Sequence, residues 1–240
     1  MSATHATIPG RLRVPRDDVV KWLRTAPKSR QDEIGRAAAD LIASIDGYAR
    51  RGRGLLSHVL GRSGAFEEWE HYPSRDAKDR HSGYRFYYHA HAARQRMPSE
   101  HGHFHIFGPV SRVRGEPKPD YTHLIGLSVD ARGFPLRVFT TNQWVTAEHW
   151  NPADEILTQI GQLDLAEARP RTVARWVQAS TRLFAPQIDA VVRLRDLRLA
   201  QRTRQLGRDA ALNDRRTHIV SQCPVDLAGQ FECLEVAGLA

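Results

Sequence analysis

The spacing of apolar residues changes twice along this chain, and this change limits the fold more than any other feature. Within residues 16–61 and 153–207, apolar side chains recur every three or four positions, which predicts helices. Between Tyr72 and Trp144 they alternate, which predicts strands. The expected strands cover 84–91, 101–108, 121–129 and 135–144. The sequence therefore predicts an α+β fold, in which helices from both ends of the chain flank an antiparallel sheet of about four strands.

The 240 residues are enough for one large domain or two modest ones. Proline and glycine interrupt residues 1–15, which we expect to form a flexible arm. Residues 16–217 are expected to form a single α+β domain, with the sheet at 72–150. The stretch 218–240 has no clear periodicity and is expected to form a C-terminal tail.

Five of the twelve histidines lie in two dense strings on the first two expected strands. The strings are His89-Ala-His91 and His101-Gly-His103-Phe-His105. Alternate side chains of a strand share a face, so each string is expected to present its imidazoles on one side. The loop 92–100 then closes a hairpin that sets His89 opposite His103 and His91 opposite His101.

Imidazoles gathered on one face favour a metal site over the two alternatives, which are histidine catalysis without a metal and a hydrogen-bonded structural cluster. Cross-strand neighbours have Cβ atoms about 4.5–5.5 Å apart, close enough to share one ion. The predicted ligands are His89, His91, His101, His103 and His105. A shell of nitrogen donors suits Zn, Fe(II), Cu or Mn, and the sequence does not choose among these divalent transition metals.

Glu100, beside the second string, is the nearest carboxylate and the predicted catalytic residue. It could complete a ligand set, act as a general base, or accept a hydrogen bond from a histidine. Asp120, His123, Glu148 and His149 are more distant candidates, for which structural roles are expected.

Three short motifs resemble known families. His101-Gly-His103-Phe-His105-Ile-Phe resembles the signature of histidine-triad nucleotide hydrolases and transferases, which implies His103 as a nucleophile toward an α-phosphate. His103-Phe-His105 resembles the metal motif of rolling-circle nucleases, but the last tyrosine of the chain, Tyr121, lies on an expected strand and not on the downstream helix that this chemistry requires. Gly83 followed by His89-Ala-His91 resembles the opening of a cupin motif, and the glutamate of that motif is missing.

A longer stretch, from His71-Tyr-Pro73 through the histidine strings to Thr140-Thr-Asn-Gln-Trp-Val145, resembles an uncharacterised bacterial family. The resemblance covers roughly residues 65–155. It implies a widespread bacterial domain and supplies no activity.

The remaining features bound the location and partners. The chain has no apolar run of membrane-spanning length and no secretory signal pattern, so a cytoplasmic protein without a membrane partner is expected. Cys223 and Cys233 lack the spacing of a zinc or redox motif. The formal charge of +8 permits a nucleic-acid partner, with Arg198 and Arg202 on a basic helix, although a solvated helix face is favoured.

The sequence thus predicts a metal-dependent enzyme, an oxygenase, another oxidoreductase or a hydrolase, that acts on a small-molecule substrate through one histidine-ligated ion. A histidine-triad-like nucleotide hydrolase and a basic nucleic-acid-binding protein are the alternatives. The oligomeric state is not predicted.

Overall fold

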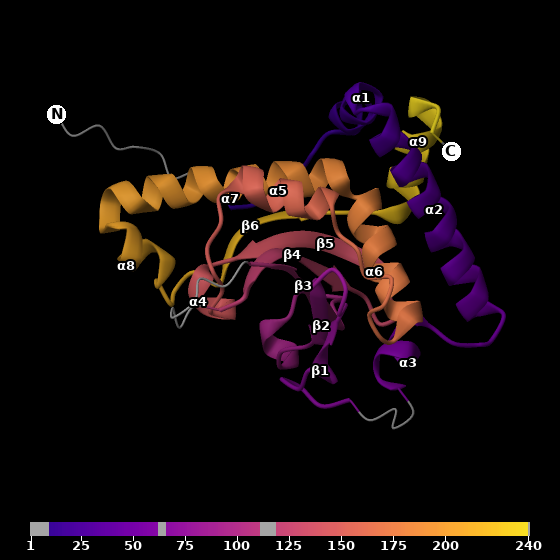
Figure 1. The fold of residues 1–240 in the computed structure, drawn as a ribbon, viewed down its shortest axis with the longest axis horizontal. Coiled ribbons are helices and arrows are strands. Elements are labelled where there is room, and N and C mark those ends of the chain that lie inside the picture. The colour runs from indigo at the N-terminus through magenta and orange to yellow at the C-terminus, as the bar shows by residue number, and fades with distance from the viewer. Residues whose placement is uncertain (1–9, 62–65, 111–118, 240) are drawn as a thin grey trace.

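A computed structural model of the protein describes residues 10–61, 66–110 and 119–239, and it confirms the α+β class (Figure 1). Most of the expected N-terminal arm lies outside these residues. Its last part is held in place, because the Leu12 amide donates to the Gln222 carbonyl at 3.0 Å.

In the described part of the chain, six strands form one antiparallel sheet whose spatial order follows the sequence order. They are β1 (Tyr72–Lys78), β2 (Arg85–His89), β3 (Gly102–Pro109), β4 (Tyr121–Val129), β5 (Pro135–Thr141) and β6 (Ile219–Pro224). The four expected strands correspond to β2–β5, within a few residues at their ends. The sheet gains one strand at each edge, and β6 lies 78 residues beyond β5 in the chain.

The C-terminal stretch 218–240 was expected to be a tail, and this expectation was wrong. Its first part is β6, which pairs with β5 from Arg137↔Pro224 to Thr141↔Ile219. Its second part is helix α9 (Leu227–Ala237), which packs against α1 (Arg16–Thr25). Asp226 caps α9 by accepting a hydrogen bond from the Gly229 amide.

Helices occupy both ends of the chain, as predicted. Besides α1 and α9 they are α2 (Lys28–Ala49), α3 (Leu55–Val59), α4 (Gln143–Thr146), α5 (Ala153–Gly161), α6 (Arg171–Leu183), α7 (Ala185–Leu206) and α8 (Arg208–Leu212). The helical pattern at 171–207 is split between α6 and α7. The second residue of α7 is a proline. Because proline lacks an amide proton, it is tolerated in the first turn of a helix and disrupts a helix interior, so α6 and α7 are separate helices.

The long helices cover one face of the sheet. Figure 1 shows α5 and α7 lying over the strands, with α6 and α2 at one end. The Ser221 hydroxyl of β6 donates to the Val191 carbonyl of α7 at 2.7 Å. Trp176 of α6 packs on Phe104 of β3, with ring centroids 5.5 Å apart. The main core therefore lies between this face and the helices.

Alternation along β2 and β3 separates the core from the histidines. Phe86, Tyr88, Phe104 and Ile106 are fully buried in the core. The residues between them, Tyr87, His89, His103 and His105, face the other side of the sheet, as the sequence predicts. One face of β2 and β3 therefore packs in the core, and the opposite face carries the histidines.

Gly126 of β4 supports this polar face because it has no side chain. A Cβ atom at this position would lie 2.3 Å from the Phe139 ring, which fills the space above it. Phe139 in turn packs edge-on against His103 and His105. We expect Gly126→Ala to lower the free energy of unfolding by about 1–3 kcal/mol, measured by urea denaturation, because the ring must move into the histidines.

The matched control is Gly161→Ala at the end of α5, where an added Cβ meets no atom within 4 Å. This variant should unfold like the wild type or be slightly more stable. Equal stability of the two alanine variants would contradict a packing role for Gly126.

Candidate metal centre

Two rows of side chains run across the sheet on its polar face. One row contains His89, His103, Ser128, Arg137 and Pro224, and the next contains Tyr87, His105, Gly126, Phe139 and Gln222. The predicted pairing of His89 with His103 is confirmed, and Tyr87 pairs with His105. Pairing of the strands therefore brings His89, His103 and His105 together.

These three histidines are close enough to hold a metal ion. One ligand atom from each lies within 4.8 Å of the others. Nε2 of His89 and Nε2 of His103 are 2.8 Å apart. Two imidazole nitrogens at this distance repel each other unless a proton or a cation lies between them. We call these residues the histidine cluster.

Polar partners orient two members of the histidine cluster. Nδ1 of His103 is 2.9 Å from Glu100 Oε1, and Nδ1 of His105 is 2.9 Å from Nε2 of His123. These contacts leave Nε2 of each ring for the cluster. Fixing a ligating histidine through its other nitrogen is the usual arrangement in protein metal sites, so the donor set fits a metal ion.

The environment keeps His89 and His105 uncharged. Burial, with repulsion from His103 and two other histidines, lowers the pKa of His89 to about 2. Burial and the neighbouring histidines also lower the pKa of His105 well below its usual value. Neutral imidazole is the form that binds metals, so both rings are ready to bind an ion at neutral pH.

Glu100 is buried and both of its oxygens are engaged. Oε1 faces His103, and Oε2 accepts a hydrogen bond from Arg137 Nη2 at 3.0 Å. Arg137 also donates to Ser128 and to Gln222. Burial raises the pKa of the Glu100 carboxyl, but the His103 hydrogen bond and the Arg137 charge outweigh it, so the net pKa is lowered. Of the three roles open to Glu100, this geometry favours orienting His103.

The other two predicted ligands lie differently. His91 is at the margin of the cluster, with its ring centroid 5.0 Å from that of His89 and 5.2 Å from that of His103, and it stacks on Trp69. His101 faces away from the cluster, and its Nδ1 hydrogen-bonds to the Tyr88 hydroxyl at 2.6 Å. The expectation that His101 shares the face of His103 was wrong, because β3 begins only at Gly102.

His123 and Glu148 form a buried layer beside the cluster. His123 contacts Thr141 Oγ1 through its Nδ1 at 3.3 Å, so both of its nitrogens have partners. Glu148 accepts hydrogen bonds from the His123 amide and the Thr122 hydroxyl. Burial raises the pKa of Glu148 to about 7 despite these hydrogen bonds. The remaining distant candidates are structural in this geometry: Asp120 pairs with Arg85, and the His149 amide donates to the Tyr121 carbonyl.

Sequence reasoning did not identify Arg137 or Phe139 as parts of this site. Arg137 and Phe139 are two positions apart on β5, so both lie on the same face of the strand. Their place beside the histidines depends on the registers of β3 with β4 and of β4 with β5. The β3–β4 register shifts between Ile106 and Phe107 at an irregularity that no sequence pattern announces. The only available signal was an arginine on the polar side of a strand.

A cleft of about 410 Å³ lies next to the histidine cluster. Its walls are Trp69, His71, Asp76, Arg85, Tyr87, His89, Phe107, Tyr121, Val145, Thr146 and Ala147. His89 belongs to both the cluster and the cleft, whereas His103 and His105 are buried behind it. The cleft therefore gives a small molecule access to one side of the cluster.

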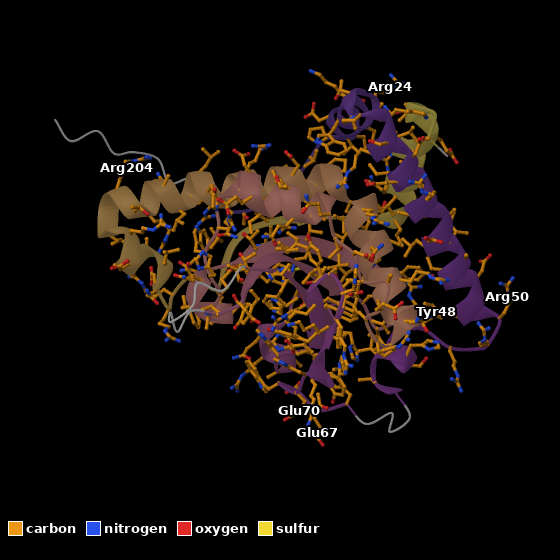
Figure 2. All side chains as sticks on the ribbon, viewed as in Figure 1. Arg24, Tyr48, Arg50, Glu67, Glu70 and Arg204 are labelled. Carbon is orange, nitrogen blue, oxygen red and sulfur yellow. The ribbon has the colours of Figure 1, made fainter. Side chains whose placement is uncertain are left out.

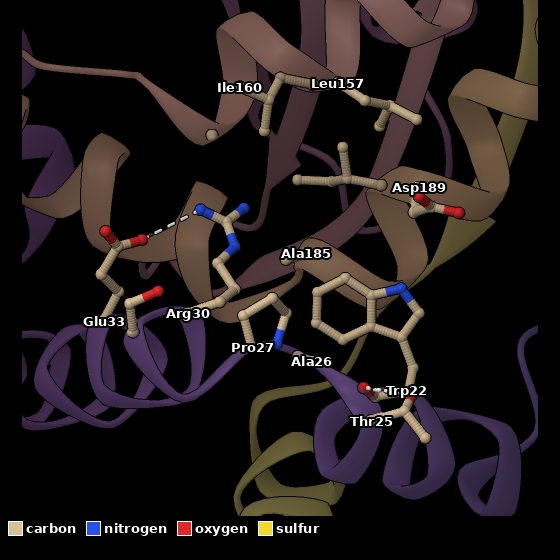
Figure 3. Close-up of a pocket in the computed structure, with 13 residues that line it drawn as sticks. Trp22, Thr25, Ala26, Pro27, Arg30, Glu33, Leu157, Ile160, Ala185 and Asp189 are labelled. Atoms are coloured by element: carbon tan, nitrogen blue, oxygen red, sulfur yellow. Dashed lines mark hydrogen bonds and ion pairs between the residues drawn. The ribbon is translucent and has the colours of Figure 1, made fainter.

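A second pocket lies among the helices (Figure 3). Trp22, Leu157 and Ile160 provide much of its apolar wall, and Arg30 pairs with Glu33 at 3.1 Å on one side. Its lining residues contain no histidine or cysteine. It offers no group of metal ligands comparable to the histidine cluster.

Several arginines of the expected basic helix are engaged within the protein. Arg193 pairs with Asp189 and Asp154, and Arg202 pairs with Asp214. Arg195 is buried on this helix. It donates to the Asn151 carbonyl, and its guanidinium carbon lies 4.3 Å from the Trp150 ring centroid. Exposed arginines do exist, and Figure 2 shows Arg24, Arg50 and Arg204 pointing outward at scattered helix ends.

Within the described ranges, no helix is both long and apolar enough to cross a membrane.

Searches of curated proteins and of solved structures found no match. Residues 35–225 match a protein family described as a domain of unknown function, DUF6969. The match extends well beyond the stretch 65–155 on which the sequence resemblance rested, and it covers more than half of the chain. The chain therefore belongs to this uncharacterised family, DUF6969.

Proposed function

We propose that this protein is a metal-dependent enzyme that acts on a small molecule through His89, His103 and His105. The observation that carries the proposal is the convergence of three imidazole nitrogens within 4.8 Å, two of them on rings fixed from behind by Glu100 and His123. Three nitrogen donors leave coordination positions for water or substrate, as in catalytic metal sites.

A bound transition metal would supply Lewis-acid chemistry, or redox chemistry if it is iron, copper or manganese. The protein's own residues would hold and orient the ligands: Glu100 fixes the His103 ring, and His123 fixes the His105 ring. Phe139 excludes water from the buried side of the cluster. The cleft beside His89 would admit the substrate.

The geometry gives less support to the two alternatives. A triad-type nucleophile at His103 needs a free ring nitrogen and access to a phosphate. His103 is only 5% exposed, and both its nitrogens contact other side chains. A nucleic-acid role is weakened because Arg193, Arg195 and Arg202 are engaged in contacts within the protein.

Metal analysis tests the proposal. Protein purified without chelators should contain about one transition-metal ion per chain by elemental mass spectrometry. His89→Ala and His105→Ala should lose the ion, and His81→Ala, at an exposed turn, should keep it. Glu100→Gln should weaken metal affinity about 10–100-fold, the usual effect of removing a partner that orients a ligand.

The enzymatic part needs a separate readout. The metal-loaded protein is incubated with a small-molecule extract in the presence and absence of dioxygen, and turnover is followed by mass spectrometry. Turnover should stop in His89→Ala. It should require dioxygen if the protein is an oxygenase and should not require it if the protein is a hydrolase. Failure of the wild type to bind Zn²⁺, Fe²⁺, Cu²⁺ or Mn²⁺ at micromolar concentration would refute the proposal.

A further inference from the structure

The walls of the cleft beside His89 are largely aromatic. Tyr87 and Phe107 lie on adjacent strands with ring centroids 5.5 Å apart, and Phe107 packs edge-on against Tyr121. Trp69 also lines the cleft. A volume of about 410 Å³ falls within the range of about 300–1,000 Å³ typical of small-molecule sites. Walls of this kind favour a ligand with a flat ring.

Trp69 is an exposed aromatic residue with a strained backbone conformation. It is 54% exposed, although most large apolar side chains of this protein are buried. Its backbone φ is +73°, in the left-handed region that bulky residues rarely adopt. Its amide is fixed by a hydrogen bond to the Ala90 carbonyl, and its ring stacks on His91. Strained backbone at an exposed aromatic residue is typical of functional positions, where a ligand can cover the ring.

Two side chains of opposite charge line the cleft. Asp76 provides the carboxylate, and Arg85 provides the guanidinium. Arg85 donates from Nη2 to Asp120 at 2.9 Å, while its buried Nε has no hydrogen-bond partner among the described residues. Asp76 lies 3.8 Å from His71 Nδ1. Because the cleft presents both a carboxylate and a guanidinium, a ligand that carries both charges can make a contact that a simple anion or cation lacks.

The spacing along β2 relates these charges to the metal ligands. Arg85, Tyr87 and His89 alternate on one face of the strand, so the Cα atoms of Arg85 and His89 are about 13 Å apart. A ligand anchored at Arg85 would therefore extend past Tyr87 toward His89. This is the arrangement needed to hold one end of a molecule and present the other to the histidine cluster.

We infer that the cleft binds an aromatic α-amino acid, or a molecule with the same zwitterionic head and a flat ring. Its carboxylate pairs with Arg85, its ammonium pairs with Asp76, and its ring lies along Tyr87 and Phe107 toward His89. This inference rests on the proposed function for its catalytic meaning, because the bound ring would be the part presented to the metal ligands.

Calorimetric titration of EDTA-treated protein tests the inference without any metal. The probes are L-phenylalanine, 3-phenylpropionate, which lacks the ammonium group, phenethylamine, which lacks the carboxylate, and L-alanine, which lacks the ring. L-phenylalanine should bind at least about tenfold more tightly than each of the other three, because each of them loses one of the contacts.

Variants assign each charge separately. Asp76→Asn should abolish the preference for L-phenylalanine over 3-phenylpropionate, and Arg85→Met should abolish its preference over phenethylamine. Each variant should also lower the affinity for L-phenylalanine at least about tenfold. Arg94→Met, on the exposed 3₁₀ helix at Ala93–Gln95, should change neither quantity. Thermal melting shows whether each variant is folded. If Arg85→Met does not fold, the result for Asp76→Asn alone decides the test.

The inference is overturned if the wild type binds 3-phenylpropionate or L-alanine as tightly as L-phenylalanine, or binds none of them. Because this titration contains no metal, its outcome is independent of the metal analysis. Ring recognition with no metal bound would leave this inference standing and remove the proposed chemistry. A bound metal with no preference for the zwitterion would do the reverse.

Discussion

Metal-free protein is expected to lose its fold when the pH falls from 7 to about 3–5. The cause is a group of buried neutral histidines: the pKa of His89 is lowered to about 2, that of His123 to about 3, and that of His105 well below its usual value, in each case mainly by burial. In the unfolded chain these residues titrate near pH 6.5. Below that pH the unfolded state binds more protons, so their contribution to stability is present above pH 6.5 and is lost as the pH falls.

The magnitude is large because three histidines act together. Each contributes about 1.4 kcal/mol per pH unit, or about 4 kcal/mol per unit in total, against a typical folding free energy of about 5–15 kcal/mol. Glu148 opposes this trend. Its pKa is raised to about 7, so its contribution is present at low pH and is lost as the pH rises through 7. One group offsets only about a third of the effect of the histidines.

Urea denaturation followed by circular dichroism at several pH values, in the presence of EDTA, measures this dependence. His123→Gln should make the slope of stability against pH shallower by about one proton. A wild-type unfolding free energy that is constant between pH 7 and pH 5 would contradict the expectation.

Replacing Arg137 by methionine is expected to destabilise the protein by about 3–5 kcal/mol. The Arg137 side chain is 10% exposed and that of Glu100 is 1% exposed, so the variant leaves a buried carboxylate without its cationic partner. Urea denaturation at pH 7 measures the loss. The double variant Glu100→Gln, Arg137→Met should recover part of it, because no unpaired charge then remains.

Arg193→Met is the matched control for Arg137→Met. Arg193 pairs with Asp189 at 3.1 Å, but its side chain is 55% exposed. Exposed ion pairs contribute about 0–1 kcal/mol, so the control should be nearly neutral. If the two methionine variants were equally stable, the buried pair would not stabilise the site as inferred.

Local patterns were sufficient to predict the centre of the site. The alternation of β2 and β3 and the length of the loop between them predicted that His89 would face His103, and the structure confirms this pairing. Both facts depend on a short stretch of chain, in which strand geometry and hairpin closure leave few alternatives. The α+β class followed in the same way from the two changes of periodicity.

Contacts between distant segments were not predictable in this way. The position of His101 depended on where β3 begins and on the Tyr88 hydroxyl, which reaches it from the core side. Strand β6 pairs with β5 after five intervening helices, and the sequence Ile219–Pro224 has little alternation that could identify it. The Glu100–Arg137 pair likewise depends on strand registers, which are set by the whole sheet.

The division of β2 and β3 into a core side and a histidine side also affects how this family can diverge. The residues that pack the core, such as Phe86 and Phe104, are next in sequence to residues of the histidine side, such as Tyr87 and His103. A substitution at one set leaves the packing of the other largely untouched. Residues of the histidine side and the cleft can therefore change one at a time between relatives while the scaffold persists, so we expect the proposed metal ligands to vary more among family members than the core of the sheet.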